Sequence, residues 1–205
     1  MKLLTYPGAP NPRRVHIFLA EKGIEIPFET VDMMKRENRT PEFIENVNLM
    51  GGLPVLELDD GSHIPESVSI CRYLEALHPE PPLFGRDPRE QARIDVWIRR
   101  MELRFMMSVG MVWVHGSPLT KAVVERQIEE VAEQNRKLVY HFFKLFDNEL
   151  RKRPYVAGES FSMADIIAFT TLEFAERLND LHPREDQEAL LAWRDACQAR
   201  PSAKA

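Results

Sequence analysis

Strand-like segments occur only in the first 77 residues of this chain, and this division limits its possible folds more than any other feature. Short apolar runs alternate there with helical patterns, in the expected order β-α-β-α-β-β-α. The first two strands, joined through a helix, should form a parallel pair with a right-handed crossover, and the turn at 59–62 adds an antiparallel hairpin. The expected elements are strand 2–5, helix 12–22, strand 27–31, helix 41–46, strand 54–58, strand 63–64 and helix 66–77.

The remainder of the chain carries only helical patterns. Residues 78–87 are rich in proline and glycine, as is typical of a linker. Two apolar stripes then predict two long helices packed together, with Pro118 between them, and Ser162 and Asp165 fit the N-cap and N3 positions of a third helix. The stripes are Ile94, Ile98, Met101, Phe105, Val109 and Val112, and Val124, Ile128, Val131, Leu138, Phe142, Leu145 and Phe146. We therefore expect an α/β domain followed by an all-α domain.

Composition and charge argue against several classes of partner. The net charge is -5 and the pI is near 5.7, whereas a nucleic-acid partner requires a basic face. No apolar run approaches the ~18–20 residues that cross a membrane, and Pro7 interrupts the start of the chain too early for a signal peptide. Cys71 and Cys197 form no CxxC motif or disulfide framework, which indicates a cytoplasmic protein. The six histidines are dispersed, so we expect no metal.

The first candidate binding element is Leu53-Pro54, which follows Gly51-Gly52 and opens an apolar strand. A proline at this point cannot donate to a sheet ladder, so it belongs at the start or the edge of a sheet. A cis bond would turn the amide and carbonyl of Leu53 outward, where they could pair with an extended peptide. The alternative is a trans proline that ends a loop, and it is favoured from this motif alone because only about 5–6% of X–Pro bonds are cis.

The second candidate element is Glu66-Ser67, at the expected start of a helix. A helix start offers unpaired amides and a partial positive charge, which suit a carboxylate. Ser67 adds a hydroxyl donor and Glu66 can bind an ammonium group, so the pair could hold the amino-acid end of a ligand. The alternative is ordinary capping, with Ser67 as the N-cap and Glu66 exposed.

The third candidate element is the helix start around Asn11 and Pro12. Asn11 fits an N-cap and Pro12 fits the first helical position. By itself this motif is explained by helix capping alone.

Six motifs occur together along the chain. They are Pro12-Arg13-Arg14-Val15, Leu53-Pro54-Val55, Glu66-Ser67, Arg153-Pro154-Tyr155-Val156-Ala157-Gly158, Ser162-Met163-Ala164-Asp165-Ile166 and Ala192-Trp193. In this combination the chain resembles the cytosolic glutathione transferase family, in particular the yeast-type branch and its bacterial relatives. The resemblance covers essentially the whole chain. It implies a thioredoxin-like, glutathione-binding domain at 1–77, a linker at 78–87, and an all-helical domain at 88–205 that forms the electrophile pocket.

The resemblance also implies how glutathione is bound. The proline matching Pro54 is cis in the family, and the residue before it, here Leu53, pairs through its backbone with the cysteinyl part of glutathione. Glu66 and Ser67 then hold the γ-glutamyl end. A basic residue in the region of Arg39 usually binds the glycine carboxylate. A second basic position of the family is occupied here by Gly52, so Arg39 or Lys35 must supply the charge.

The group that stabilises the thiolate is left open by the sequence. Lowering a thiol pKa by two units takes about 2.7 kcal/mol, more than the roughly 0.3–1 kcal/mol typical of a helix start, so an aimed donor is needed. Ala9 stands where the family usually has Ser or Cys. The candidates are Asn11 with the helix-start amides, Tyr6, and His115 with Ser108 two turns earlier. The helix-start donors are slightly favoured.

The expected activity is conjugation of glutathione, as co-substrate, to small hydrophobic electrophiles. The expected protein is a cytoplasmic homodimer with a detoxification role. Two alternatives share the scaffold: a glutathione-dependent isomerase, peroxidase or dehalogenase, and a binding or regulatory protein without activity. The pairing of Glu66-Ser67 with Leu53-Pro54 favours an enzyme, whereas Ala9 favours the inactive alternative.

Overall fold

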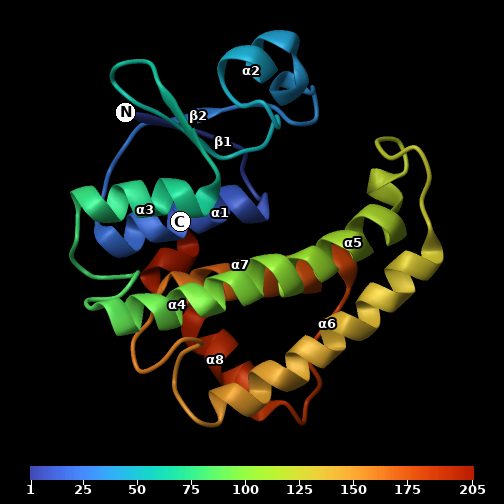
Figure 1. The fold of residues 1–205 in the computed structure, drawn as a ribbon. Coiled ribbons are helices and arrows are strands. Elements are labelled where there is room, and N and C mark those ends of the chain that lie inside the picture. Colours follow the sequence, from blue (N-terminus) through green and yellow to red (C-terminus); the bar gives the residue numbers. More distant parts are fainter. The chain divides into compact units, whose positions relative to one another are not determined.

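The chain forms two compact units in the computed structural model, which describes residues 1–205. The first unit comprises residues 1–82 and 201–205, and the second comprises residues 83–200. A four-stranded sheet and three α-helices make up the first unit, and the second is helical (Figure 1). The elements of the first unit are β1 (Lys2–Thr5), α1 (Pro10–Lys22), β2 (Phe28–Thr30), α2 (Pro41–Asn46), β3 (Val55–Glu57), β4 (His63–Pro65) and α3 (Ser67–Leu77). The expected α/β plus all-α fold is confirmed, with the thioredoxin-like order of elements in the first unit.

The sheet has the strand order β2-β1-β3-β4. Strand β1 is parallel to β2, and β3 is antiparallel to both β1 and β4. Both the parallel pair and the hairpin are therefore as predicted. Because β4 runs in the same direction as β1, their carboxyl ends lie at the same edge of the sheet as the amino end of β3. Helices α1 and α3 start at this edge.

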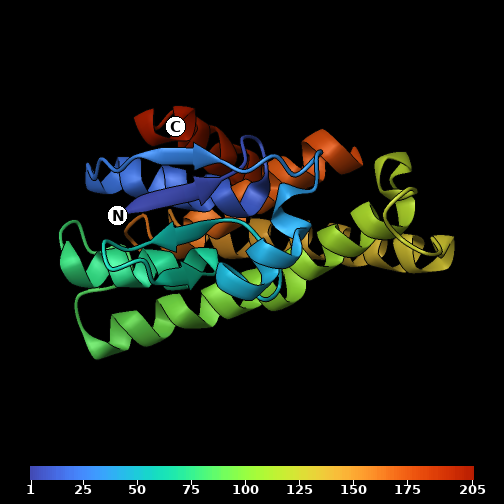
Figure 2. The ribbon, with the colours of Figure 1, turned by 90° about the horizontal axis from the view of Figure 1, so that it is seen from above.

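Helices α1 and α3 lie side by side on one face of the sheet (Figures 1 and 2). Their apolar residues recur at helical spacing and are fully buried, including Val15 and Phe18 on α1 and Ile70 and Leu74 on α3. This packing fixes the position of both helix starts relative to the strands that precede them.

Helix α1 begins earlier than the sequence predicts. Ala9 is its N-cap, in extended conformation, and Pro10 is its first residue. The prediction of Asn11 as N-cap and Pro12 as first residue is therefore wrong. Proline is favourable at the first position of a helix because its fixed φ is already helical. A backbone N–H at that position would have no intrahelical acceptor, so its absence costs nothing. The helix ends at Gly23, whose φ of 63° is easily adopted by glycine.

The second unit contains five α-helices: α4 (Pro88–Arg100), α5 (Met107–Gly116), α6 (Glu129–Leu150), α7 (Met163–Asn179) and α8 (Glu188–Gln198). A π-helical turn at Met101–Met106 joins α4 to α5, so these form the first predicted long helix. All six residues of its apolar stripe are buried. Phe105 packs against aromatic rings of α6, so the two helices do pack together. The second predicted stripe is nevertheless largely wrong, because of its residues only Phe146 is buried and Leu138 is 48% exposed. The buried face of α6 is instead formed by Ala132, Val139, Phe143 and Phe146.

The connection between α5 and α6 is longer than predicted. Pro118 does separate the two helices, but Val124 and Ile128 lie before α6, and their assignment to that helix is wrong. The amide of Gln127 donates to the carbonyls of Val114 and Ser117 at 3.3 and 2.6 Å. These bonds satisfy carbonyls at the end of α5 and hold the chain out of helical conformation up to Ile128.

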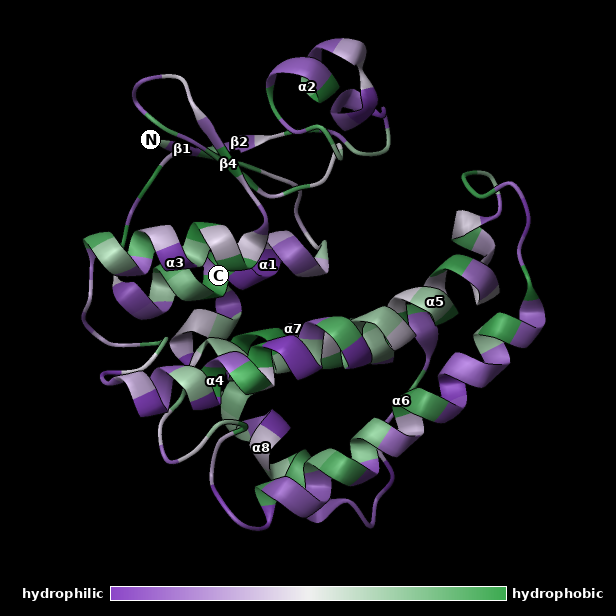
Figure 3. Ribbon diagram, viewed as in Figure 1, coloured by the Kyte–Doolittle hydropathy of each residue, from purple (hydrophilic) through white to green (hydrophobic).

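Helix α7 is the most deeply buried helix of the second unit, with 12 of its 17 residues in the core. It packs against α4 and α5, and Figure 3 shows its apolar residues. The predicted capping box at its start is present, since the Asp165 carboxylate accepts from the N–H and hydroxyl of Ser162, both at 3.0 Å.

The last five residues return to the α/β unit. The guanidinium of Arg13 donates to the carbonyls of Ala203 and Ala205 at 2.8 and 2.9 Å, and the hydroxyl of Ser202 donates to Glu21. These contacts attach residues 201–205 along α1.

No helix of the chain is long and apolar enough to span a membrane.

Candidate functional site

Three of the predicted site residues meet at the edge of the sheet where β1 and β4 end. Tyr6 follows β1, Leu53 precedes β3 by two positions, and Glu66 follows β4. Leu4 lies opposite Val55, and Val55 lies opposite Pro65, so the three segments are in register. Adjacent strands are about 4.8 Å apart, so the edge formed by β1, β3 and β4 spans about 10 Å. The topology thus assembles one site from residues far apart in the sequence.

Leu53 has an unsatisfied backbone at this edge. Its exposed fraction is 8%, but its N–H and C=O have no hydrogen-bond partner within the protein. Buried backbone groups are paired in more than about 90% of cases. The bond from Leu53 to Pro54 is cis. An extended peptide lying along the edge would provide the missing partners.

Glu66 and Ser67 form the start of α3, but not by ordinary capping. Glu66 is the N-cap, with a φ of 70° that is uncommon for a residue other than glycine, and its side chain caps no amide. Ser67 is the first helical residue and is 5% exposed. The amides of the first turn are therefore without a side-chain cap. Together with the positive end of the helix dipole, they suit a ligand carboxylate.

A buried arginine that we did not predict as a site residue lies behind this helix start. Arg14 is 2% exposed, and its Nη1 donates to the Oγ of Ser67 at 3.4 Å. Its spacing of three and four residues from the apolar Ile17 and Phe18, which places it on the buried face of α1, was the available signal. Cys71 lies nearby within α3, where burial raises the pKa of its thiol despite the charge of Arg14. That thiol therefore stays protonated and is not a nucleophile.

Asn11 carries the hydrogen-bond donors that are available at the start of α1. Of the first three helical residues, Pro10 and Pro12 have no N–H, so Asn11 supplies the one amide available there. Its side-chain Oδ1 is buried without a hydrogen-bond partner. Since the Ala9 side chain offers no donor, a thiolate at this helix start could be met only by the backbone or side-chain amide of Asn11.

Tyr6 has a different environment. It is partly buried and packs against an apolar cluster that includes Leu4, Val31, Phe43, Leu53 and Val55. Its hydroxyl has no hydrogen bond within the protein. The structure therefore brings Tyr6 to the same edge as Leu53, where its ring contributes an apolar wall.

The two candidate basic residues are placed differently. Arg39 lies in the short helix Glu37–Arg39, and its Nη1 donates to the carbonyl of Met50 at 3.0 Å, beside the loop that leads to Leu53. Lys35 is largely exposed and pairs with Asp32 at 3.4 Å. Arg39 is thus attached to the segment that carries the site, whereas the ion pair of Lys35 is with Asp32.

His115 and Ser108 belong to the helical unit. Ser108 is buried on α5, and His115 lies two turns later, in the last turn of that helix. The Nδ1 of His115 accepts from the N–H of Ile128 at 3.3 Å. The imidazole must therefore carry its proton on Nε2, which leaves that nitrogen as a donor.

Both halves of the chain match models of one family. Residues 3–82 match the glutathione S-transferase N-terminal domain, and residues 105–201 match the glutathione S-transferase C-terminal domain. Glutathione S-transferase 2 of Saccharomyces cerevisiae is 40% identical over 208 residues, which cover 99% of this chain and 88% of that protein. The crystal structure of Gtt2 from Saccharomyces cerevisiae matches with a TM-score of 0.93 and 40% identity over 100% of this chain and 99% of that one.

Two bacterial proteins show the range of these relatives. The structure of a glutathione S-transferase domain-containing protein of Marinobacter aquaeolei matches with a TM-score of 0.91 and 34% identity, over 98% of this chain and 99% of that one. Dichloromethane dehalogenase of Methylorubrum extorquens is 30% identical over 213 residues, which cover 100% of this chain and 73% of that protein.

Proposed function

The chain belongs to the glutathione S-transferase family, and from this premise we propose that it conjugates the thiolate of glutathione to small hydrophobic electrophiles. One observation carries the proposal: the unpaired backbone of Leu53 and the uncapped start of α3 lie at the same edge of one sheet. A tripeptide whose first residue keeps a free amino-acid end needs both features.

We assign the binding roles as follows. The backbone of Leu53 pairs with the cysteinyl residue of glutathione. Ser67 and the first amides of α3 bind the γ-glutamyl carboxylate, and Glu66 binds the ammonium group. Arg39 supplies the positive charge for the glycine carboxylate, with Lys35 as the alternative.

Asn11 is our first candidate for the thiolate stabiliser. Support comes from the prolines on either side: Pro10 and Pro12 have no N–H, so the backbone N–H and the side-chain Nδ2 of Asn11 are the donors at this helix start. A hydrogen bond to a charged group contributes about 1.5–3 kcal/mol, which approaches the stabilisation that an ionised thiol at neutral pH requires. Tyr6, and His115 with Ser108, remain the alternatives, and His115 has its Nε2 proton available to hold a water.

The domain roles follow from this assignment. Residues 1–77 form the glutathione-binding domain, residues 78–87 the linker, and residues 88–200 the domain that supplies the electrophile pocket, while residues 201–205 return to the first unit. A glutathione-dependent dehalogenase is the second candidate function, because a named dehalogenase is 30% identical to this chain. Conjugation and thiolytic dehalogenation share the same first step, attack of the thiolate on carbon.

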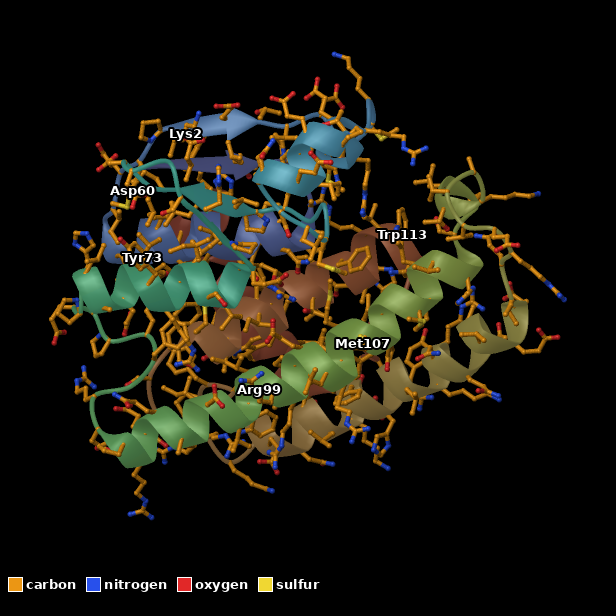
Figure 4. The ribbon with its side chains drawn as sticks, turned by 45° about the horizontal axis from the view of Figure 1, so that its top comes forward. Lys2, Asp60, Tyr73, Arg99, Met107 and Trp113 are labelled. Carbon is orange, nitrogen blue, oxygen red and sulfur yellow. The ribbon has the colours of Figure 1, made fainter.

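We also propose a cytoplasmic homodimer with a role in detoxification. Val96, Leu103 and Met107 are exposed at intervals of seven and four residues along α4–α5, and Met107 is labelled in Figure 4. Met50, in the loop before Leu53, is 70% exposed. Exposed apolar side chains in such groups mark protein interfaces. Leu103→Glu should convert the dimer to a monomer in sedimentation experiments.

The function is tested by retention on immobilised glutathione followed by an assay with an activated aryl halide. Retention with turnover supports conjugation, and turnover on dihalomethane but not on the aryl halide supports the dehalogenase. Retention without turnover on aryl halides, epoxides or peroxides supports a binding protein. Absence of retention at millimolar glutathione would remove both enzymatic proposals.

A further inference from the structure

We propose that Arg14 is a positioning residue that fixes the Ser67 hydroxyl as a hydrogen-bond donor toward the γ-glutamyl carboxylate of glutathione. The inference rests on the proposed function, because it assumes that this carboxylate binds at the start of α3. It adds a residue and a mechanism that the binding assignment does not contain.

The direction of the hydrogen bond carries the argument. A guanidinium only donates, so the Oγ of Ser67 must accept the bond from Nη1 of Arg14 over 3.4 Å. A serine hydroxyl has one proton of its own, and that proton still needs an acceptor. The protein provides none, since the bond from Arg14 is the only hydrogen bond of the Ser67 side chain.

Burial restricts where the proton can point. Arg14 is 2% exposed and Ser67 is 5% exposed, so water has little access to either group. The unused proton lies beside the first-turn amides of α3, which have no side-chain cap and attract an anion. A ligand carboxylate at this position would accept from both the amides and the hydroxyl.

Arg14 therefore acts before the ligand arrives. Without it, the hydroxyl could rotate and use its proton elsewhere, and part of the binding energy would be spent on reorienting it. When Arg14 is present, the Ser67 hydroxyl is already oriented as a donor before the ligand binds. The guanidinium then donates to the hydroxyl and the hydroxyl donates to the carboxylate, so each hydrogen bond polarises the next.

The test is Arg14→Lys, which keeps the buried positive charge but ends short of the Oγ of Ser67. Calorimetric titration with glutathione should show about tenfold weaker binding, as expected for loss of a charge-assisted hydrogen bond. In a Ser67→Ala background the same change should alter affinity less than threefold. The KM for glutathione should rise about tenfold, while kcat should stay within twofold of the wild-type value at every pH.

Arg13→Lys is the matched control. It makes the same change on the neighbouring residue, whose guanidinium binds the carbonyls of Ala203 and Ala205 instead. Glutathione binding should remain within twofold. If Arg14→Lys does not fold by thermal melting, Arg14→Gln with and without Ser67→Ala provides the same comparison.

Three outcomes would overturn the inference while leaving the proposed function intact. Wild-type affinity in Arg14→Lys would show that charge alone acts. An equal loss in the Ser67→Ala background would show that Arg14 does not act through Ser67. A matching loss of kcat and thermal stability would indicate a structural role. Failure of the wild-type chain to bind glutathione would instead remove the proposed function.

Discussion

The indole Nε1 of Trp193 donates to the carboxylate of Asp165 over 3.0 Å and so joins helix α8 to the start of α7. The same carboxylate accepts from the N–H of Val156 and from the N–H and hydroxyl of Ser162. Four donors thus converge on one fully buried acid in the helical unit. Burial nevertheless raises the pKa of Asp165 to about 6.

This pKa predicts how stability depends on pH. Because the folded pKa of about 6 exceeds the ordinary value of 3.8, the folded chain holds a proton more tightly than the unfolded chain between these values. The contribution of Asp165 to the free energy of unfolding should therefore fall as the pH rises from about 4 to about 6, by up to about 3 kcal/mol. It should be level outside this window.

The measurement uses urea denaturation at several pH values in this range to obtain the difference in unfolding free energy between the wild type and Asp165→Asn. Asparagine has no titration, so the difference isolates Asp165. A difference that is constant with pH, or that grows as the pH rises, would contradict the prediction.

Asp147, in the last turn of α6, should be important for stability because it also contacts another helix. Its Oδ1 accepts from the N–H groups of Ala189 and Leu190 at 2.9 and 3.2 Å, and thereby caps α8 from α6. Asp147→Ala should lower the free energy of unfolding by about 2 kcal/mol, the upper range for loss of an N-cap. The control is Glu133→Ala on the same helix, whose exposed pair with Arg136 should contribute less than about 0.5 kcal/mol.

Glu66 and Ser67, the proposed clamp for the γ-glutamyl end, should contribute more to glutathione binding than Asn11 does. Removal of a donor or acceptor for a charged group costs about 1.5–3 kcal/mol, so Glu66→Ala and Ser67→Ala should each weaken binding about tenfold or more. Asn11→Ala should weaken it less, because the thiol of glutathione is neutral until it ionises. If titration gives the reverse order, the clamp is misplaced.

Asn11 should instead control ionisation of the bound thiol. Loss of one charge-assisted hydrogen bond of about 1.5–3 kcal/mol raises the thiol pKa by about 1–2 units. The ultraviolet absorbance of the thiolate in the glutathione complex, followed against pH, measures this shift for Asn11→Ala. Tyr6→Phe and His115→Ala serve as comparisons, and a larger shift in either would transfer the role to that residue.

The elements of this chain follow from local patterns and were largely predictable. The order of strands and helices in the first 77 residues, the end of α1 at Gly23 and the capping box at Ser162 all depend on residues within about one or two turns of each other. The start of α1 was misplaced because Asn11 and Pro10 both suit a helix start, and local preference alone does not choose between them.

The edge that carries the site was only partly predictable. Leu53, Glu66 and Ser67 were candidates from the sequence itself and received their roles from the family resemblance. The unpaired backbone of Leu53, by contrast, depends on where β3 begins beside β1. Capping alone would have made Ser67 an N-cap, yet the chain enters α3 through Glu66 with a positive φ.

The sequence by itself thus determined the order of elements, the change from α/β to all-α and the family of the chain, because periodicity, turn residues and motifs are written in neighbouring positions. Only the tertiary structure decided which polar groups meet. Arg14 and Ser67 are 53 residues apart, Asp165 and Trp193 are 28 apart, and Asp147 and Ala189 are 42 apart. Such buried pairs form because desolvation makes an unpaired polar group costly, and the partner available is set by how the elements pack.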